Sequence, residues 1–308
     1  MNISNKIFDP QDKHISKMIV AMEGWEEKSS LEMNMPSGMF GQKIIVKTGG
    51  VKLDSDDLDI EFTIPFDDDV IPNEAEIAVF NISKNTISQL KNNEEITVEA
   101  GYGEDTGVIF SGRISYVKTT REGCDNRTTI NAIDKEDFEN DSLQSLSYKK
   151  GTKASYILKD LISKLNLPVA MFEVAKDTTM KEATNIDGAL TDTIKEYSEM
   201  CGSVTYINGG KVYTRPRSKA IGAHFDVSVD TGLIDSPEEF EETITNNEGE
   251  SSKEEKITGY KIKMLLQHQI TTGASVNLES IHANGKYVVR NGKHTCNGTD
   301  FITEIEVI

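Results

Sequence analysis

The stretch from Glu95 to Asp134 constrains the fold more than any other part of the chain. It contains runs in which apolar and polar residues alternate, at 95–101, 108–119 and 128–133. Alternation with a period of two residues is typical of β-strands that bury one face. The segments between the runs are polar and contain glycine, as hairpin loops do. Gly112 lies inside the second run, where a glycine usually marks a bulge or a bend. We therefore expect an antiparallel meander that belongs to a small barrel or sandwich.

The chain before this stretch has the same character. Further strands are expected at 42–48, 58–65 and 74–81, because each run alternates or is continuously apolar. A short helix is expected to follow, with Ser83 as its N-cap. Residues 41–134 are therefore expected to form one β-domain with a single short helix.

The segment 135–220 differs, because its apolar residues recur with a helical period. Amphipathic helices are expected from Thr152, ending before Pro168, and over 188–201, where Gly202 follows as a C-cap. A hairpin with an Asn-Gly-Gly turn is expected after the second helix. This segment is expected to be a small α+β domain.

Residues 221–308 return to β character. The subsegment 236–256 is strongly acidic and has little apolar pattern, so it is expected to be a solvated loop. Four further strands are expected, at 257–266, 274–280, 285–291 and 300–307.

Length and charge limit the class of protein. A chain of 308 residues suggests two or three domains. Its formal net charge of −18, from 51 acidic and 33 basic residues, argues against general binding of nucleic acid and favours solubility by self-repulsion. No apolar run is long enough to cross a membrane, and the first residues lack the build of a signal peptide. The three distant cysteines are expected to be reduced thiols.

Several sequence motifs, and their order along the chain, resemble those of a known protein family. The order of a strand, AGYG, a polar loop, GVIFSGRI, a long strand and TTINAID resembles the hub proteins of phage tail baseplates. That family includes the late control gene D proteins and the hubs of PBSX-like prophages and contractile bacteriocins. A helix leading into CG, a strand and NGGKVYTRPR is similar to the helical middle of such hubs. The match is closest at the end of the chain, from GYKIKMLL through GKYVVRNGKHTCNGTDFITEIEV.

The resemblance implies a fold and a function. It implies a mainly β protein in which two tail-tube-like β-barrel or sandwich domains, 41–134 and 221–308, flank the α+β domain 135–220, after an N-terminal arm, 1–40. It implies a structural hub in the baseplate of a phage tail or tail-like particle, assembled in the bacterial cytoplasm. Three copies would form a pseudo-sixfold adaptor between the hexameric tail tube and the trimeric central spike. Wedge and tape-measure proteins are further possible partners.

Few residues suggest chemistry. Asp67, Asp68 and Asp69 in one turn could bind Ca²⁺, but no EF-hand spacing surrounds them. His294 and Cys296 lie two apart on one strand, where they share a face, but no motif supplies an acid to orient the histidine. No zinc-site spacing connects the histidines of the C-terminal third, which are His224, His268, His282 and His294. We therefore expect no catalytic, cofactor-binding or metal-binding residues, no cofactor and no enzymatic activity.

Two other classes of function stay open at this stage. One is a tail-associated enzyme that degrades peptidoglycan, and the other is a carbohydrate-binding module at a tail tip. Turnover of cell-wall substrate by the purified chain would identify the first, and binding to a glycan array would identify the second. No sequence-specific binding of nucleic acid and no membrane association are expected. For a ring-shaped hub, the net charge leads us to expect acidic side chains along the channel.

Overall fold

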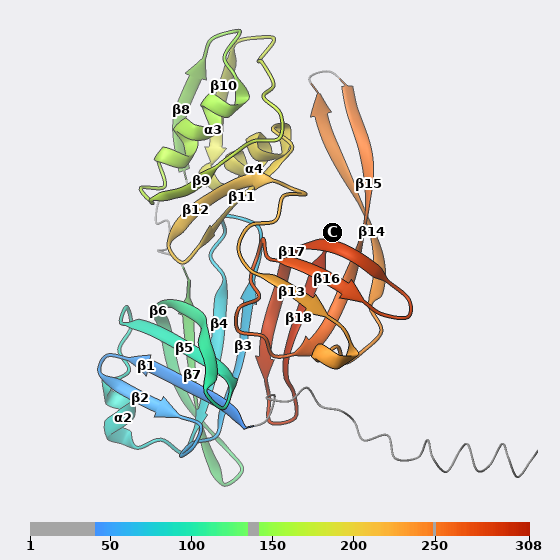
Figure 1. Cartoon of the computed structure of the whole chain (residues 1–308). Coiled ribbons are helices and arrows are strands. Elements are labelled where there is room, and N and C mark those ends of the chain that lie inside the picture. The colour runs from blue at the N-terminus through green and yellow to red at the C-terminus, as the bar shows by residue number, and fades with distance from the viewer. Residues whose placement is uncertain (1–40, 135–141, 249–250) are drawn as a thin grey trace, which may run out of the picture. The chain divides into compact units, whose positions relative to one another are not determined.

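The computed structural model describes residues 41–134, 142–248 and 251–308. The expected N-terminal arm, 1–40, lies outside the described residues. The structure is mainly β, with 54% of residues in strands and 12% in helices, which confirms the expected fold class. Strands of many lengths recur from one end of the described chain to the other (Figure 1).

The first β unit contains the expected meander. Its core is built from alternate strand residues, among which Val46, Val98 and Ile130 are fully buried. The Ser83 hydroxyl accepts a hydrogen bond from the Thr86 amide at 3.1 Å, as expected for an N-cap. The elements are β1 (Gln42–Thr48), β2 (Val51–Asp54), β3 (Ile60–Phe66), β4 (Glu74–Phe80), α2 (Lys84–Gln89), β5 (Glu95–Tyr102), β6 (Asp105–Glu122) and β7 (Asp125–Ile133).

The middle of the chain contains both expected helices and the expected hairpin. The buried side chains of the helices, including Ile157, Leu161 and Ile194, form a second core. A two-stranded sheet of β8 and β10 was not expected from the sequence. The elements are β8 (Ser142–Tyr148), α3 (Ala154–Ser163), β9 (Val169–Phe172), β10 (Thr184–Ala189), α4 (Leu190–Met200), β11 (Ser203–Asn208) and β12 (Lys211–Pro216).

The last part of the chain is a second β unit with a core of its own, which includes Val276, Val289 and Val307. A short 3-10 helix, η1 (Val229–Thr231), follows its first strand. The strands are β13 (His224–Val227), β14 (Glu238–Glu248), β15 (Ser251–Leu265), β16 (Ser275–Glu279), β17 (Asn284–Cys296) and β18 (Phe301–Val307).

The expectation of a solvated loop at 236–256 was wrong. Most of this segment belongs to β14 and β15, which pair in antiparallel register from Glu238↔Lys261 to Glu248↔Ser251. Main-chain hydrogen bonds across two strands need no buried apolar side chains, so a low apolar content did not exclude a hairpin. Opposite charges also meet across the pair, because Lys256 Nζ lies 3.2 Å from Glu241 Oε2.

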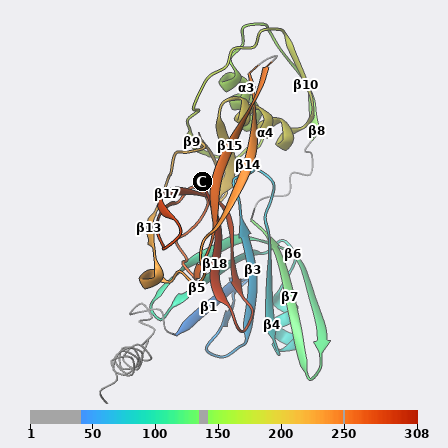
Figure 2. The ribbon, with the colours of Figure 1, turned by 90° about the vertical axis from the view of Figure 1, so that its right-hand side faces the viewer.

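Strands of the two β units pair with each other. The second half of β17 pairs antiparallel with β3, in a register that sets Cys296 opposite Phe62 and Gly292 opposite Phe66. A 13-stranded sheet results, in the order β14-β15-β18-β17-β3-β4-β7-β6-β5-β1-β2, with β16 beside the first half of β17 and β13 beside β16. Figures 1 and 2 show β3 beside the strands of the second unit.

The strand order of the first unit recurs in the second. Both units contain a run of five strands, β3 to β7 and β14 to β18. Numbered from one to five along the chain, the strands of each run lie in the sheet in the order 1-2-5-4-3. The first run has the order β3-β4-β7-β6-β5, and the second has the order β14-β15-β18-β17-β16. The neighbour of the third strand differs, since β1 pairs antiparallel with β5 whereas β13 pairs parallel with β16. The pairing therefore reveals a repeat that the sequence does not.

Candidate functional site

One face of the shared sheet is polar across both β units. Its side chains come from β15, β18, β17, β3, β4 and β7, and they alternate with the core residues of the same strands. On β3, for example, Thr63 is exposed whereas Phe62 and Ile64 are buried. Charged members of this face are Glu61, Glu74, Glu76, Arg127, Lys261, Lys263, Lys293, Glu304 and Glu306.

Opposite charges on this polar face are paired across neighbouring strands. Lys293 Nζ lies 2.8 Å from Glu304 Oε2, and Lys261 Nζ lies 3.1 Å from Glu306 Oε1. In the first unit, Arg127 Nη2 lies 3.0 Å from Glu76 Oε1. Pairs of this kind contribute little to stability at an exposed site, but opposite charges on facing strands favour the observed register over one that opposes like charges.

The environment of Glu306 favours its charged form. Partial burial raises the pKa of this carboxyl, but hydrogen bonds from Asn291 and Lys261 outweigh the burial, and its pKa is lowered below the ordinary value. The Asn291 amide donates to Glu306 Oε2 at 2.9 Å. The polar face therefore keeps this charge at neutral pH.

A half-buried ion cluster lies where β17 bulges. Arg290 is the extra residue of the bulge, and its Nε lies 3.4 Å from Asp68 Oδ2 in the turn after β3. Its Nη1 also contacts the Glu242 carboxylate of β14. Burial lowers the pKa of Arg290, but the nearby carboxylates outweigh it, so the pKa is raised and the guanidinium stays charged. The cluster joins three segments that are distant in the sequence.

The aspartates considered as possible Ca²⁺ ligands, Asp67, Asp68 and Asp69, lie in a turn that Asp67 and Asp69 stabilise by hydrogen bonds to its main chain. Asp69 Oδ1 accepts a hydrogen bond from the Ile71 amide at 2.7 Å, and Asp67 Oδ1 accepts one from the Asp69 amide at 3.3 Å. Such bonds are typical of Asx turns. In residues 41–134, 142–248 and 251–308, no group of three or more His, Cys, Asp or Glu side chains could hold a metal ion.

The histidines of the C-terminal third lie on separate elements. His224 Nδ1 lies 3.1 Å from Ser275 Oγ, and His268 Nε2 lies 3.8 Å from Asp105 Oδ1. His282 is exposed in the loop before β17. His268 and His294 both line a cavity of about 380 Å³. Its lining also includes Ser111, Thr271 and Thr272. The Thr271 hydroxyl accepts a hydrogen bond from the Asn208 amide, and the Thr272 hydroxyl donates one to the Asp67 carbonyl.

His294 and Cys296 share the buried face of β17, as the spacing predicted. His294 Nδ1 lies 2.9 Å from Thr303 Oγ1, and its ring packs on Phe66 with centroids 5.0 Å apart. Burial lowers the pKa of His294 to about 4. Burial also raises the pKa of the Cys296 thiol, so this cysteine stays protonated and unreactive. Both residues belong to the core.

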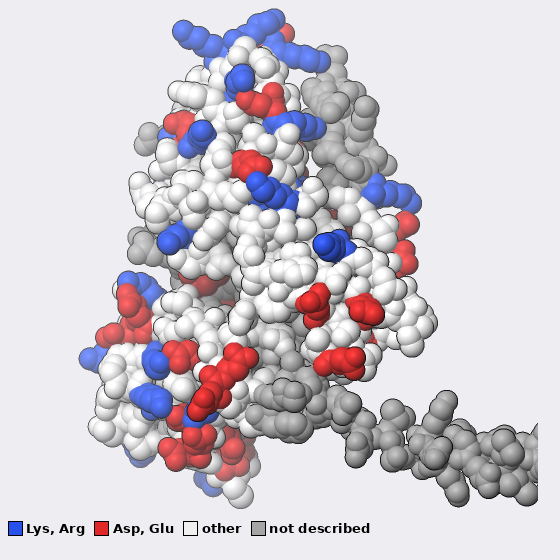
Figure 3. All heavy atoms as spheres, viewed as in Figure 1, with Lys and Arg blue, Asp and Glu red and all other residues white. Residues whose placement is uncertain are grey.

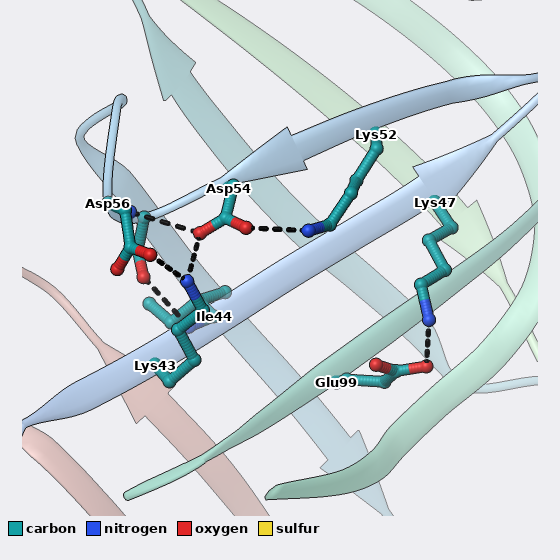
Figure 4. Close-up of polar contacts among 8 residues, drawn as sticks. Lys43, Ile44, Lys47, Lys52, Asp54, Asp56 and Glu99 are labelled. Atoms are coloured by element: carbon teal, nitrogen blue, oxygen red, sulfur yellow. Dashed lines mark hydrogen bonds and ion pairs between the residues drawn. The ribbon is translucent and has the colours of Figure 1, made fainter. Parts of the chain in front are cut away.

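One end of the sheet is protected by charge. The edge strand β2 has only four residues, and Lys52 Nζ lies 2.8 Å from Asp54 Oδ2 along it. Figure 4 shows Lys43 of β1 between Asp54 and Asp56, and Lys47 beside Glu99. Lys43 Nζ lies 2.5 Å from Asp54 Oδ1. A short edge strand whose charges are already paired is a poor template for another strand.

Two longer edges have no partner strand within the described residues. One is β14, which pairs only with β15. The other is the outer half of β6, because β5 pairs with β6 only as far as Arg113. Tyr116, on this outer half, is 53% exposed despite its aromatic ring. Neither edge could be predicted from the sequence, since an edge depends on which strands pair. Figure 3 shows acidic and basic side chains interspersed over the face that carries β1, β5 and β6.

The sequence matches the family model described as baseplate hub gp41 over residues 43–303. Solved structures share the fold. One is the 43 kDa tail protein of prophage MuSo2 from Shewanella oneidensis, with 9% identity and a TM-score of 0.58 over 87% of this chain and 98% of that chain. Another is the tail protein from Neisseria meningitidis MC58, with 10% identity and a TM-score of 0.58 over 87% of this chain and 96% of that one.

A third similar structure is the E. coli c3393 protein, described as a component of the type VI secretion system with structural similarity to T4 bacteriophage tail proteins gp27 and gp5. It shares 10% identity and a TM-score of 0.54 over 85% of this chain and 76% of that chain. A comparison with curated protein sequences finds no match. No helix in the described part of the chain is long and apolar enough to cross a membrane. Because the family model covers most of the sequence, the chain belongs to the baseplate hub gp41 family and has a structural role in the phage tail baseplate.

Proposed function

We propose that this hub is the adaptor between the hexameric tail tube and the trimeric central spike. Three copies form a ring, and the two β units of each copy give it pseudo-sixfold symmetry. The observation that carries the proposal is the β3–β17 pairing, which joins two units of the same strand order edge to edge. Three copies with two such units present six similar positions to a hexameric tube and a threefold repeat to a spike.

The proposal divides the chain as the sequence suggested. An N-terminal arm, 1–40, precedes a first tube-like domain, 41–134, and a second one, 221–308, with the α+β domain 135–220 between them. The cores support this division in part: those of the helical middle and of the second β unit come almost entirely from their own segments, whereas the core of the first unit also includes Leu266, Cys296 and Phe301 of the second. The partners of the ring are the tube and spike proteins, with wedge and tape-measure proteins as further contacts.

We assign the polar face of the shared sheet to the channel of the ring. It is the face opposite the cores, and it runs without interruption from β15 to β7. Its acids are largely paired with bases, such as Lys293 with Glu304 and Arg127 with Glu76. With this orientation the channel wall carries mixed, paired charge, rather than the predominantly acidic lining that the net charge led us to expect. Such a wall offers phosphate groups neither strong attraction nor strong repulsion within a Debye length of roughly 8–10 Å.

The proposal assigns the chain a geometric role without catalysis, in a phage virion or a tail-like particle, after assembly in the bacterial cytoplasm. The experiment that tests it is electron microscopy of the full chain, purified alone and after co-expression with the tube and spike proteins of the same particle. We expect closed rings with threefold symmetry, one end bound to the tube and the other to the spike. A chain that stays monomeric alone and with both partners would contradict the proposal.

A further inference from the structure

The repeat in strand order extends to a defect in register. Each fourth strand has one extra residue where it pairs with the fifth strand. In β6 this residue is Ser115, between Ile114↔Ala132 and Tyr116↔Asn131. In β17 it is Arg290, between Val289↔Val307 and Asn291↔Glu306. A bulge disrupts the ladder at a specific place, so its recurrence aligns the two units residue by residue. In this alignment Val117 corresponds to Gly292, and Arg121 to Cys296.

The aligned strands differ in what covers their outer edge. Beyond its bulge, β17 is covered by β3, from Gly292↔Phe66 to Cys296↔Phe62. The corresponding part of β6, from Val117 to Arg121, has β7 on one side and no strand on the other among the described residues. Within one chain, therefore, the outer edge of the fourth strand pairs with another strand in the second unit and has no partner strand in the first.

Side-chain exposure shows the same difference. His294 and Cys296 are 2% and 6% exposed on β17. Their counterparts on β6, Thr119 and Arg121, are exposed. The part of β17 that β3 covers is buried, whereas the corresponding part of β6 is exposed to solvent. The strand that corresponds to β3 is β14, whose outer edge pairs with no strand within the described residues, although α4 lies beside part of β14.

The two free edges have opposite charge. The start of β14 has the sequence EEFEE, from Glu238 to Glu242. The outer half of β6 has the sequence YVKTTRE, in which the bases Lys118 and Arg121 outnumber the single acid Glu122. Acidic and basic side chains on facing strands favour pairing and steer the approach of the two surfaces.

From these observations we infer that β14 of one copy adds to the outer half of β6 of the next copy, in the register that β3 and β17 use within the chain. The inference rests on the proposed ring and names the surface that closes it. Carrying the β3–β17 register across the repeat sets Val117 opposite Glu241 and Thr119 opposite Glu239 of the neighbouring copy. Lys118 then lies diagonally between Glu238 and Glu242 on the polar face. The strand junctions within and between copies then become alike, which gives the ring the pseudo-sixfold symmetry proposed above.

Disulfide crosslinking tests the register. The full chain carries Cys124→Ser, which removes the exposed thiol, together with Thr119→Cys and Glu239→Cys. A second variant carries Thr120→Cys with Glu238→Cys, because directly opposite pairs alternate between Cα separations of about 4.5 and about 5.5 Å and the closer pair crosslinks better. The control carries Thr119→Cys with Ser236→Cys, which shifts one thiol by about 10 Å along the strand.

We expect mild oxidation of at least one in-register variant to give covalent dimers and trimers on a non-reducing gel, with little crosslinking of the control. Trimers that form normally in every variant but do not crosslink at either pair would overturn the inference and leave the proposed ring intact. Trimers that fail to form in the parent chain, alone or with the tube and spike proteins, would overturn the proposed function itself.

Charge reversal gives a second, independent test. Lys118→Glu with Arg121→Glu places like charges against the acidic start of β14, and we expect association of copies to weaken by at least roughly tenfold. The matched control, Lys84→Glu with Lys91→Glu, changes the net charge equally at exposed positions elsewhere and should associate normally. Adding Glu238→Lys and Glu239→Lys to the first variant restores opposite charges and should recover association. A first variant that associates as well as the control contradicts the inference.

Discussion

The Nε atom of Arg290 lies 3.4 Å from a carboxylate oxygen of Asp68, a residue 222 positions earlier in the chain. Arg290 is the bulge residue of β17, and Asp68 lies in the turn that follows β3. The side chains of both are less than one-fifth exposed, at 16% and 13%. The ion pair therefore links β17 to the turn after β3, next to the end of the β3–β17 pairing.

Replacing Arg290 by alanine should destabilise the chain by about 2–3 kcal/mol, because the largely buried Asp68 carboxylate would be left without this partner. Urea unfolding of the wild type and the variant measures this difference in the free energy of unfolding. Arg113→Ala is the matched control, since the Arg113–Glu95 pair is exposed and its loss should cost less than about 1 kcal/mol. Equal effects of the two substitutions would show that the Arg290 cluster contributes no more than a surface pair.

Stability should fall as the pH is lowered from 6.5 towards 4, because of His294. The pKa of its buried ring is about 4, below the ordinary value of 6.5, so the unfolded chain binds a proton more readily across this range. Stability from this group is therefore fully present above pH 6.5 and is lost progressively below it, on the order of 3 kcal/mol in all.

Denaturant unfolding at about pH 7.5 and about pH 5 measures this loss. His294→Gln removes the titrating group, and we expect a flatter profile over the same interval even though the variant starts from lower stability. The carboxyl groups with lowered pKa, such as Glu306, contribute in a more acidic range, below the ordinary value of 4.5. A His294→Gln profile as steep as the wild-type one would assign the loss to other groups.

Alanine should be tolerated poorly at Gly112. A Cβ at this position would lie 2.1 Å from the carbonyl oxygen of Ile133, a backbone atom that cannot turn aside. We expect a loss of more than about 2 kcal/mol or insoluble expression. Gly123→Ala is the control, because it meets no neighbouring atom and costs only about 1 kcal/mol for its positive φ. Thermal unfolding of the two variants would contradict the prediction if Gly112→Ala were the milder change.

Thiol labelling should distinguish the three cysteines. Cys124 is exposed, whereas Cys201 and Cys296 are buried. Burial raises the pKa of Cys201 to about 11, so little thiolate is available there even when a reagent arrives. We expect rapid labelling of one thiol in the folded chain, lost in Cys124→Ser, and labelling of the other two only on unfolding. Rapid labelling of two or more thiols in the folded chain would contradict the burial of the cores.

The sequence predicted elements that local pattern determines. The alternation over 95–134 predicted β5, β6 and β7, and Ser83 predicted the start of α2. The position of Gly112 predicted an irregular strand, and extra residues do interrupt the pairing on both sides of it, at Ile109 and Ser115. The shared face of His294 and Cys296 was predicted for the same reason, since side chains two apart on a strand point the same way.

What the sequence did not reveal depends on distant partners. Nothing in the local sequence distinguishes Arg290 from other charged residues, because its partners Asp68 and Glu242 lie far away in the chain. The hairpin of β14 and β15 was missed because its main-chain hydrogen bonds leave no periodic trace in an acidic segment. The free edges of β6 and β14 were invisible for a related reason, because an edge is defined by strands that do not pair.

The pairing of β3 with β17 has a consequence for how the chain is made. Cys296 Sγ lies 3.5 Å from the carbonyl oxygen of Ile60, across a separation of 236 positions. The first β unit emerges from the ribosome long before β17 is synthesised. The edge of β3 that pairs with β17 therefore has no partner strand while the rest of the chain is made. Its sequence, IEFTIPF, is apolar enough to recruit a wrong strand in that interval. Pro65, which has no amide hydrogen to offer, makes that waiting edge a poorer template for aggregation.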